Sequence, residues 1–154
     1  MDIIFSEVKN KIDLNESFEL RKKVFVVEQE CPIEEEFDEF DNINRIGKDS
    51  FHFNVYKDNI CISTSRIVIT GISDTNSSAK IQRVCVLKDY RGAGVGLFMM
   101  SNLHKYLINK NIKKITLSSQ DHAIEFYKKL GYIEIGSEYL EAGIIHKKMY
   151  INFF

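Results

Sequence analysis

Three glycines lie within five residues in the run Arg91-Gly92-Ala93-Gly94-Val95-Gly96, which we call the glycine loop. Glycine has no Cβ, so a ligand can approach its backbone closely. Several backbone N–H groups of such a loop can point at one spot, and a following helix adds unsatisfied donors and a partial positive charge. The loop therefore predicts an anion site, most naturally for phosphate, to which Arg91 could add a side-chain charge.

The elements that must position the glycine loop are a strand before it and a helix after it. Residues 81–87 are β-branched or apolar enough to form a strand. In residues 97–107 the apolar side chains recur at spacings of three and four, which defines one helix face. That face consists of Met99, Met100, Leu103 and Leu107.

Two common phosphate-binding motifs do not fit the loop. A Walker motif ends in Gly-Lys-Ser/Thr, whereas Leu97 and Phe98 follow Gly96 here. A Rossmann dinucleotide site requires an acidic residue about 20 residues further on, at a strand end. The corresponding residues 112–119 contain no acid. The sequence therefore disfavours both motifs.

Together with a second motif, the glycine loop resembles the acetyl-CoA loop of the GNAT acetyltransferase superfamily, which holds the pyrophosphate of coenzyme A. Residues 120–132 look like the helix of the other GNAT motif, Ala-x-x-Phe-Tyr-x-x-Leu-Gly-Phe/Tyr. Gln120 stands where the family often has Asn. Residues 20–32 and 139–146 look like the ElaA-like branch, so the resemblance spans the chain.

The resemblance and the order of the expected elements imply a mixed α/β fold in a single domain over residues 1–154. A central mixed, mostly antiparallel sheet would be flanked by helices on both faces. The resemblance further implies an N-acetyltransferase that transfers the acetyl group of acetyl-CoA to a primary amine by direct attack in a ternary complex. The amine would belong to a small molecule or a peptide. Two alternatives remain: a non-catalytic acyl-CoA-binding module and a nucleotide-binding regulator.

In the family, the backbone of the strand before the loop pairs with the pantetheine amides of the cofactor. This strand parts from the next one, here residues 115–119, and leaves a wedge for the thioester. Cys85 lies in the first strand, where a small buried residue is a commoner role than an acyl-cysteine nucleophile. The resemblance implies contacts to acetyl-CoA from Val84, Cys85, Val86, Arg91, Gly92, Ala93, Gly94, Val95, Gly96, Ser119, His122, Phe126 and Tyr127.

Tyr127 is the candidate acid that protonates the departing CoA thiolate. It stands at the acid position of the family, and a phenol is a donor with a pKa near 10. Adjacent residues of a helix point to different faces, so a core-facing Phe126 would turn Tyr127 toward the cofactor. The alternative is that Tyr127 is a buried packing aromatic.

Deprotonation of the amine is the larger chemical task. An alkyl amine with a lysine-like pKa of about 10.4 is mostly protonated at pH 7, a penalty of roughly 4.6 kcal/mol. We favour Glu28 and His146 as catalytic residues because they lie in the segments that resemble the family, and we expect a carboxylate that acts through water. The candidate bases are Glu28, Glu30, His122, Glu141 and His146.

Charge is distributed unevenly along the chain. The formal net charge is −1, but residues 28–41 hold eight Asp and Glu without any Lys or Arg, so the remaining residues carry +7. A basic remainder suits a polyphosphate cofactor, and this acidic segment could attract a cationic amine. The alternative is a solvated acidic loop. The same distribution argues against a nucleic-acid partner.

The composition also restricts the compartment and the metal content. The start Met-Asp-Ile-Ile-Phe-Ser-Glu does not resemble a signal peptide, and no apolar stretch approaches the length of a membrane span, so a cytoplasmic protein without membrane contact is expected. The three cysteines lack a CxxC pair and are expected to be reduced. The four histidines lack zinc spacing, so no metal is expected.

The sequence also predicts less regular segments. A helix capped by Asn15 or Ser17 is expected to bend, or to give way to a second short helix, before Cys31. Residues 31–50 are expected to be mostly loop, and residues 71–79 are expected to form a hairpin loop. The further strands are expected at residues 2–8, 51–56, 60–70, 112–118, 132–135 and 144–151.

Four side chains carry separate expectations. Arg66 shares a strand face with apolar residues and must lie at the wet end of its strand or be paired. Asp121 is a plausible cap for the helix that carries Tyr127. The aromatic end of the chain, Phe153-Phe154, is expected to pack on its own sheet, with a homodimer contact as the alternative to a monomer.

Overall fold

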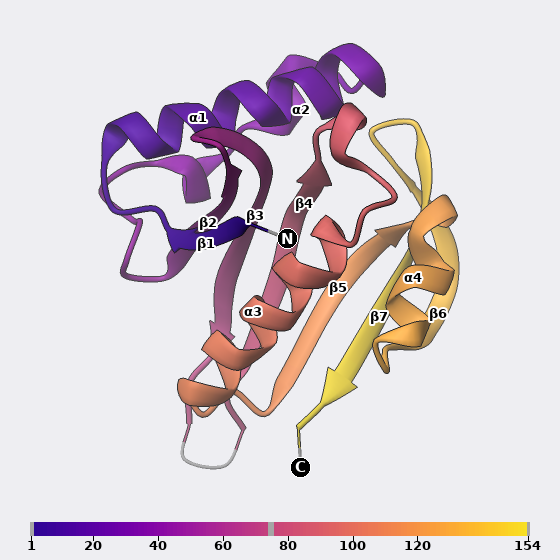
Figure 1. The fold of residues 1–154 in the computed structure, drawn as a ribbon. Coiled ribbons are helices and arrows are strands. Elements are labelled where there is room, and N and C mark those ends of the chain that lie inside the picture. Colours follow the sequence, from indigo (N-terminus) through magenta and orange to yellow (C-terminus); the bar gives the residue numbers. More distant parts are fainter. Residues whose placement is uncertain (1, 74–75, 154) are drawn as a thin grey trace.

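A twisted seven-stranded sheet in the order β1-β2-β3-β4-β5-β7-β6 forms the centre of the computed structural model, which describes residues 2–73 and 76–153 (Figure 1). Neighbouring strands are antiparallel except β4 and β5, which are parallel. The expected mixed, mostly antiparallel sheet is therefore confirmed. The strands are β1 (Ile3–Glu7), β2 (Ser50–Lys57), β3 (Ile60–Gly71), β4 (Ser78–Val86), β5 (Lys114–Gln120), β6 (Ile133–Glu141) and β7 (Ile144–Asn152).

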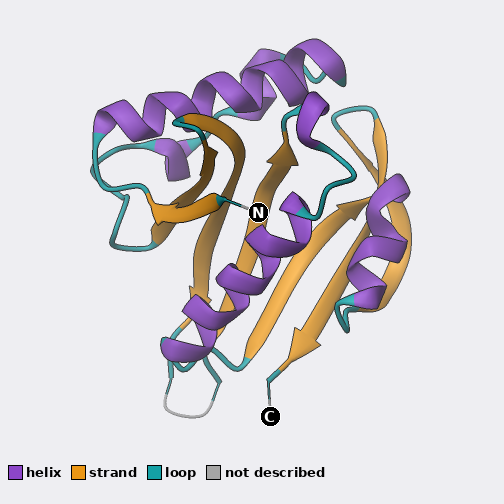
Figure 2. Ribbon diagram, in the orientation of Figure 1, coloured by secondary structure: helices purple, strands orange, loops and turns teal. Residues whose placement is uncertain are grey.

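Helices lie on both sides of the sheet (Figure 2). The long helix α1 packs on β2 and β3, and α3 packs on β3 and β4. Adjacent residues of β3 serve the two faces: Ser65 donates a hydrogen bond to Met99 Sδ of α3 at 3.3 Å, whereas Arg66 reaches the other face. The helical segments are α1 (Lys11–Arg21), η1 (Lys22–Glu28), α2 (Ile33–Glu36), η2 (Glu39–Asp41), η3 (Lys88–Tyr90), α3 (Val95–Asn109), η4 (Asp121–Ala123) and α4 (Ile124–Lys129).

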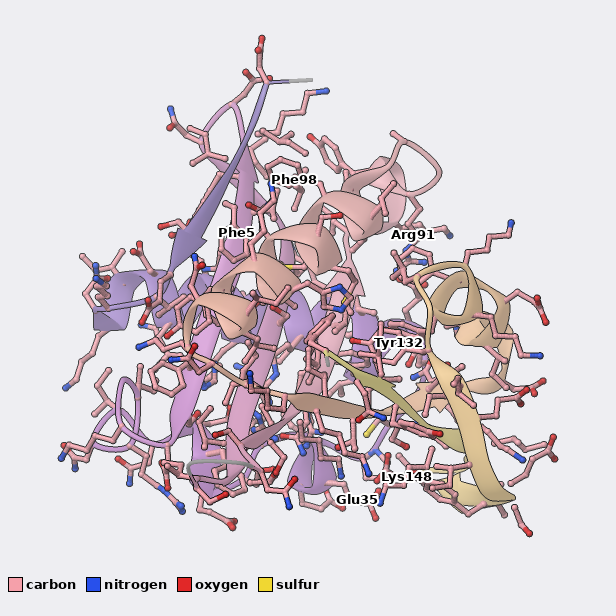
Figure 3. All side chains as sticks on the ribbon, turned by 90° about the horizontal axis from the view of Figure 1, so that it is seen from below. Phe5, Glu35, Arg91, Phe98, Tyr132 and Lys148 are labelled. Atoms are coloured by element: carbon pink, nitrogen blue, oxygen red, sulfur yellow. The ribbon has the colours of Figure 1, made fainter. Side chains whose placement is uncertain are left out.

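The core forms between α3 and the sheet, as the apolar spacing predicted. The four side chains of the expected helix face are all fully buried, and each contributes about 1.5–3 kcal/mol relative to an exposed position. Figure 3 shows Phe5 and Phe98 at the edge of this core. The helix ends where expected, since Asn111 adopts the left-handed conformation (φ 61°) that asparagine tolerates. The buried face consists of Met99, Met100, Leu103 and Leu107.

The change predicted in the N-terminal helix before Cys31 takes the form of a short π-helix rather than a break. The helix continues from α1 into η1, a seven-residue π-helix. The π-helix ends when the N–H of Gln29 bonds to the carbonyl of Val24 at 3.0 Å and Glu30 turns into the left-handed region (φ 59°). A wider turn accommodates the β-branched run without a break, and π-helical turns are frequent at functional sites.

Arginines hold part of the acidic segment: Glu36 and Asp41 are buried and paired, whereas Glu30, Glu34, Glu35 and Glu39 are exposed. The short elements α2 and η2 interrupt the loop expected at residues 31–50. Arg21 binds Glu36 (2.8 Å) and Asp41 (2.6 Å), and it is 1% exposed. Arg66 is likewise 1% exposed and binds Asp38 (2.7 Å) and Asp41 (3.1 Å), so the paired alternative is correct. The charges of the segment therefore stabilise its attachment to α1 and the sheet.

Other expectations need smaller corrections. Asp121 does not cap α4: it opens the turn η4, and the position before α4 is Ala123, which makes no side-chain capping bond. The strands β3 and β4 extend into the hairpin expected at residues 71–79, of which residues 74 and 75 lie outside the described residues. The ring of Phe153 packs edge-on against His104 at 5.5 Å, while Phe154 lies outside the described residues.

His52 makes the folded state sensitive to acid. Burial lowers the pKa of His52 to about 4, and its Nε2 donates to the carbonyl of Phe40 at 3.0 Å. Because this pKa lies below the unfolded value of about 6.5, the stabilisation is complete above pH 6.5 and is lost as the pH falls toward 4. We expect the free energy of unfolding to drop by about 2 kcal/mol between pH 7.5 and 5 in urea titrations.

The control for this prediction is His52→Gln, whose side-chain amide can donate the same hydrogen bond without titrating. The drop between pH 7.5 and 5 should shrink in this variant. An equal drop in the parent and in His52→Gln would contradict the assignment.

Candidate active site

The strands β4 and β5 separate at one end of the sheet (Figure 1). Their parallel pairing ends with Ile81 opposite Leu117, although β4 continues to Val86 and β5 continues to Gln120. A bulge lies at this point, because two residues of β4, including Arg83 at φ 58°, face one residue of β3. A bulge bends its strand and increases the local twist. The result is a wedge between residues 82–86 and residues 118–120.

A cavity of about 880 Å³ opens at this wedge. Its size lies within the usual range of small-molecule and cofactor sites. Of the residues proposed from the sequence, Ala93 and the candidate base Glu30 do not line the cavity, and both are exposed. The proposed residues that line it are Glu28, Val84, Cys85, Val86, Arg91, Gly92, Gly94, Val95, Gly96, Ser119, His122, Phe126, Tyr127 and His146.

The conformation of the glycine loop explains its composition. Gly92 (φ 79°) and Gly94 (φ 84°) both adopt the left-handed region that favours glycine. Gly94 is the N-cap of α3, so the first amides of that helix lack acceptors within the helix and lie at the cavity. At Gly96 a Cβ would lie 3.4 Å from the ring of Phe126, so glycine allows α3 and α4 to approach closely. The loop can therefore offer several donors to an anion.

Arg91 makes a contact that the sequence did not reveal. Its guanidinium binds both carboxylate oxygens of Glu28 at 2.5 and 2.9 Å, and its Nε donates to the carbonyl of Val86 at 2.9 Å. These hydrogen bonds lower the pKa of Glu28 below its ordinary value. The charge of Arg91 is thus engaged with the π-helix and is not free to face an anion.

Tyr127 and Phe126 both face the cavity. Their rings meet edge to face at 5.1 Å, and Tyr127 is the more buried of the two, at 8% exposure. Both side chains also contact the apolar core, so the two residues do not divide between core and cavity as expected. Burial raises the pKa of Tyr127, with a further contribution from Cys85. No buried polar side-chain atom of the described residues lacks a partner, and no hydrogen bond to the Tyr127 hydroxyl is found there, so this hydroxyl is accessible from the cavity.

His146 lies at the opposite wall of the cavity. It pairs with Gln120 at the end of β5 and with Tyr139 of β6, and its ring stacks on Tyr139 at 6.0 Å. Its Nδ1 lies 2.7 Å from the carbonyl oxygen of Ile144, and its Nε2 lies 3.5 Å from Oε2 of Glu141. A buried imidazole and a partly exposed carboxylate thus face the same space.

Comparison with known proteins decides the family. Residues 26–153 match the family model described as an acetyltransferase (GNAT) domain. The chain belongs to the GNAT acetyltransferase family. It is 37% identical to the uncharacterized N-acetyltransferase YjcF of Bacillus subtilis (strain 168), over 92% of this chain and 94% of that protein.

Two crystal structures support the same placement of this GNAT protein. Escherichia coli ElaA is 29% identical, with a TM-score of 0.79 and coverage of 96% of this chain and 98% of that chain. An acyl-CoA N-acyltransferase from Pseudomonas aeruginosa is 25% identical, with a TM-score of 0.82 and coverage of 97% and 99%. The ElaA-like branch and the acyltransferase class are therefore confirmed.

Four more residues of the cavity are Cys85 and Ser119, which were proposed from the sequence, and Gln29 and Gln120, which were not. Burial raises the pKa of the Cys85 thiol, so it stays protonated, and Ser119 donates to the carbonyl of Gln120 at 2.9 Å. Sequence reasoning missed a reciprocal amide pair, in which Gln29 and Gln120 each donate to the other at 3.1 and 2.8 Å. This pair joins the π-helix to β5 across 91 residues of sequence. Only the position of Gln120 in its motif gave any signal.

Neither a metal-binding cluster nor a membrane-spanning helix occurs in the described ranges, residues 2–73 and 76–153. There, no three His, Cys, Asp or Glu side chains are arranged to hold a metal ion. In the same ranges of this GNAT protein, no helix is both long and apolar enough to cross a membrane.

Proposed function

We propose that this protein transfers the acetyl group of acetyl-CoA to a primary amine of a small molecule or peptide. The observation that carries the proposal is the wedge between β4 and β5, which opens directly beside the glycine loop. Past Ile81 the edge of β4 has no partner on β5, so its backbone groups can pair with the amides of pantetheine. The first amides of α3 would bind the pyrophosphate.

In this arrangement the thioester lies in the wedge and the amine attacks it directly. The amine nitrogen forms a bond to the thioester carbonyl carbon as the carbon–sulfur bond breaks. The nitrogen loses its proton to a base, and the hydroxyl of Tyr127 gives its proton to the CoA sulfur. The base then releases its proton to solvent and Tyr127 takes one from solvent, so a neutral amine and acetyl-CoA give the amide and the free CoA thiol.

The geometry favours His146 over Glu28 as the base. Both carboxylate oxygens of Glu28 are engaged by Arg91, which lowers the pKa of Glu28 and so weakens it as a proton acceptor. The Nε2 atom of His146 faces the cavity and is not bound by an arginine or lysine of the described chain. Glu28 instead fixes Arg91 and the end of the π-helix.

Replacement of Tyr127 by phenylalanine tests the acid. We expect Tyr127→Phe to lower kcat about 100-fold, near the low end for a general acid, because a thiolate already leaves readily. Affinity for acetyl-CoA should stay nearly unchanged, since only the hydroxyl is removed. The rate of free-thiol release measures kcat, and calorimetric titration measures the affinity for acetyl-CoA.

Tyr132→Phe is the matched control for this substitution. Tyr132 is equally buried, but its hydroxyl bonds to His104 at 2.7 Å, and the residue does not line the cavity. Its loss should leave kcat unchanged. A kcat of Tyr127→Phe within about threefold of the parent would assign Tyr127 to packing alone.

A thermal-shift comparison followed by an activity assay tests the function as a whole. Acetyl-CoA and CoA should raise the melting temperature, whereas ATP and NAD should not. Thiol release over a panel of amines should then depend on the amine. Stabilisation by acetyl-CoA without any amine-dependent release would favour a binding module. Stabilisation by ATP or NAD alone would favour a nucleotide-binding regulator.

A further inference from the structure

His146 occupies a defined position at the end of the wedge. It lies on β7 directly opposite Gln120, and Gln120 follows Ser119, which also lines the cavity. The side chain of His146 is 8% exposed, whereas that of Glu141 is 58% exposed. An amine substrate that approaches the thioester from solvent would therefore contact Glu141 first and His146 next.

The backbone fixes the proton of the neutral imidazole. A carbonyl oxygen can only accept a hydrogen bond, so the 2.7 Å contact from Nδ1 to the carbonyl of Ile144 requires a proton on Nδ1. In a neutral imidazole the other nitrogen, Nε2, then carries the lone pair. Nε2 is the atom that faces Glu141.

In the neutral form of His146, two hydrogen-bond acceptor atoms therefore lie close together. The lone pair of Nε2 and the Oε2 atom of Glu141 are 3.5 Å apart, which exceeds an ordinary hydrogen bond. A group that donates hydrogen bonds to both atoms would satisfy them, and a cationic donor would also match the charge of the carboxylate.

The other charged groups of the cavity do not compensate Glu141. Arg91 is bound to Glu28, Arg83 is bound to Glu36 at 3.3 Å, and Lys80, which also lines the cavity, makes no ion contact with Glu141 in the described residues. Within the described chain, Glu141 forms its one ion contact with His146. The titratable groups that face His146 are Glu141 and Tyr139 of β6. The other titratable residues that line the same cavity are Glu28, Cys31, Glu35, Glu36, Lys80, Arg83, Cys85, Tyr90, Arg91, His122 and Tyr127.

We propose that His146 Nε2 and the carboxylate of Glu141 together bind the ammonium group of the acceptor, and that His146 removes one of its protons. One N–H bond of the ammonium breaks, the proton forms a bond to Nε2, and the freed nitrogen lone pair attacks the thioester carbonyl. As the carbon–sulfur bond breaks, the nitrogen gives its second proton to solvent and the CoA sulfur takes a proton from Tyr127. Glu141 and the Ile144 carbonyl stabilise the resulting imidazolium, which later releases its proton to solvent. This inference rests on the proposed function and restricts the acceptor to alkyl amines that are protonated at neutral pH.

Binding of methylammonium tests the site without turnover. Nitrogen-15 NMR of the imidazoles should place the proton of free, neutral His146 on Nδ1. Methylammonium should perturb the Nε2 resonance, whereas tetramethylammonium, a cation without N–H donors, should not. Glu141→Gln should weaken the effect about tenfold or more, and Glu138→Gln, on the same strand but outside the cavity, should leave it unchanged. A proton on Nε2, or equal effects of the two cations, would overturn the proposal.

Kinetics with the alkyl amine that releases thiol fastest test the proton transfer. His146→Gln should lower kcat/KM about 10²–10⁴-fold near neutral pH, with an approximately tenfold gain per pH unit as the amine itself deprotonates. His104→Gln, outside the cavity, is the control. Glu141→Gln, at an exposed position, should mainly raise KM and covers the case in which His146→Gln fails to fold. Methylammonium binding without turnover of any amine would refute acetyl transfer and leave the ammonium site intact, whereas turnover unaffected by either variant would refute this site alone.

Discussion

Gly94→Val is expected to abolish acetyl-CoA binding, which in the parent should lie in the micromolar range typical of such substrates. At φ 84° Gly94 holds the left-handed conformation that turns the chain into α3. A β-branched residue is strained there, and its side chain would occupy the space in which the phosphates meet the first amides of the helix. Loss of two charge-assisted hydrogen bonds would cost roughly 3–6 kcal/mol, which exceeds a hundredfold in affinity.

Gly47→Val separates this effect from general backbone strain. Gly47 has nearly the same conformation (φ 86°), has no atom within 4 Å of its Cβ position, and does not line the cavity. The two variants should lose comparable thermal stability, but only Gly94→Val should lose the calorimetric signal of acetyl-CoA. Retained affinity in a folded Gly94→Val protein would exclude the glycine loop as the phosphate site.

Local patterns in the sequence predicted the parts of the site that depend on local structure. The spacing of Met99, Met100, Leu103 and Leu107 determines which face of α3 meets the sheet, because helix geometry alone brings these residues together. The spacing of the three glycines similarly predicts a loop whose backbone can approach a ligand closely. The wedge was predicted only from the family resemblance, because no side-chain pattern indicates where the pairing of β4 and β5 ends.

The parts that could not be predicted depend on pairing between distant residues. Glu28 and Arg91 are 63 residues apart, and nothing in either segment reveals that the loop arginine is engaged by the π-helix. The same holds for Arg66, which meets Asp38 and Asp41 only after β3 and the acidic segment have been brought together. A count of acidic residues gave the charge of the segment but could not identify the arginines that pair with Glu36, Asp38 and Asp41.

The π-helix is a third feature that the sequence could not predict, for a different reason. Its run of β-branched residues signalled that an α-helix would be weak there, but not whether the chain would bend, restart or widen. The outcome depends on contacts at its end, where Gln29 meets Gln120 and Glu28 meets Arg91. These contacts bring the end of the π-helix to the cavity.

Arg21→Met is expected to lower the free energy of unfolding by up to about 3–5 kcal/mol, since it removes the nearer arginine from two buried carboxylates and leaves them only the longer contacts to Arg83 and Arg66. Arg21 is 1% exposed and bonds to Glu36 and Asp41, while its guanidinium lies 4.8 Å from the ring centre of Phe37. Although burial opposes ionisation of Asp41, the hydrogen bonds and charge of Arg21 lower its pKa to about 2. Methionine preserves most of the apolar stem, so the loss reports mainly on charge. Urea unfolding at pH 7 measures the change.

Arg45→Met is the matched control, because Arg45 also bonds to a carboxylate, Asp49 at 2.6 Å, and lies 4.5 Å from the ring centre of Phe40. That pair is exposed and screened by solvent, so its loss should cost far less than the loss of Arg21. Adding Asp41→Asn to Arg21→Met should restore part of the stability, since the second change removes one uncompensated buried charge. Equal losses from the two arginines, or an additive loss in the double variant, would show that the buried charges do not control this segment. Glu36, one of the carboxylates that Arg21 binds, also lines the cavity. The buried ion pairs that stabilise the acidic segment therefore also hold part of the cavity wall.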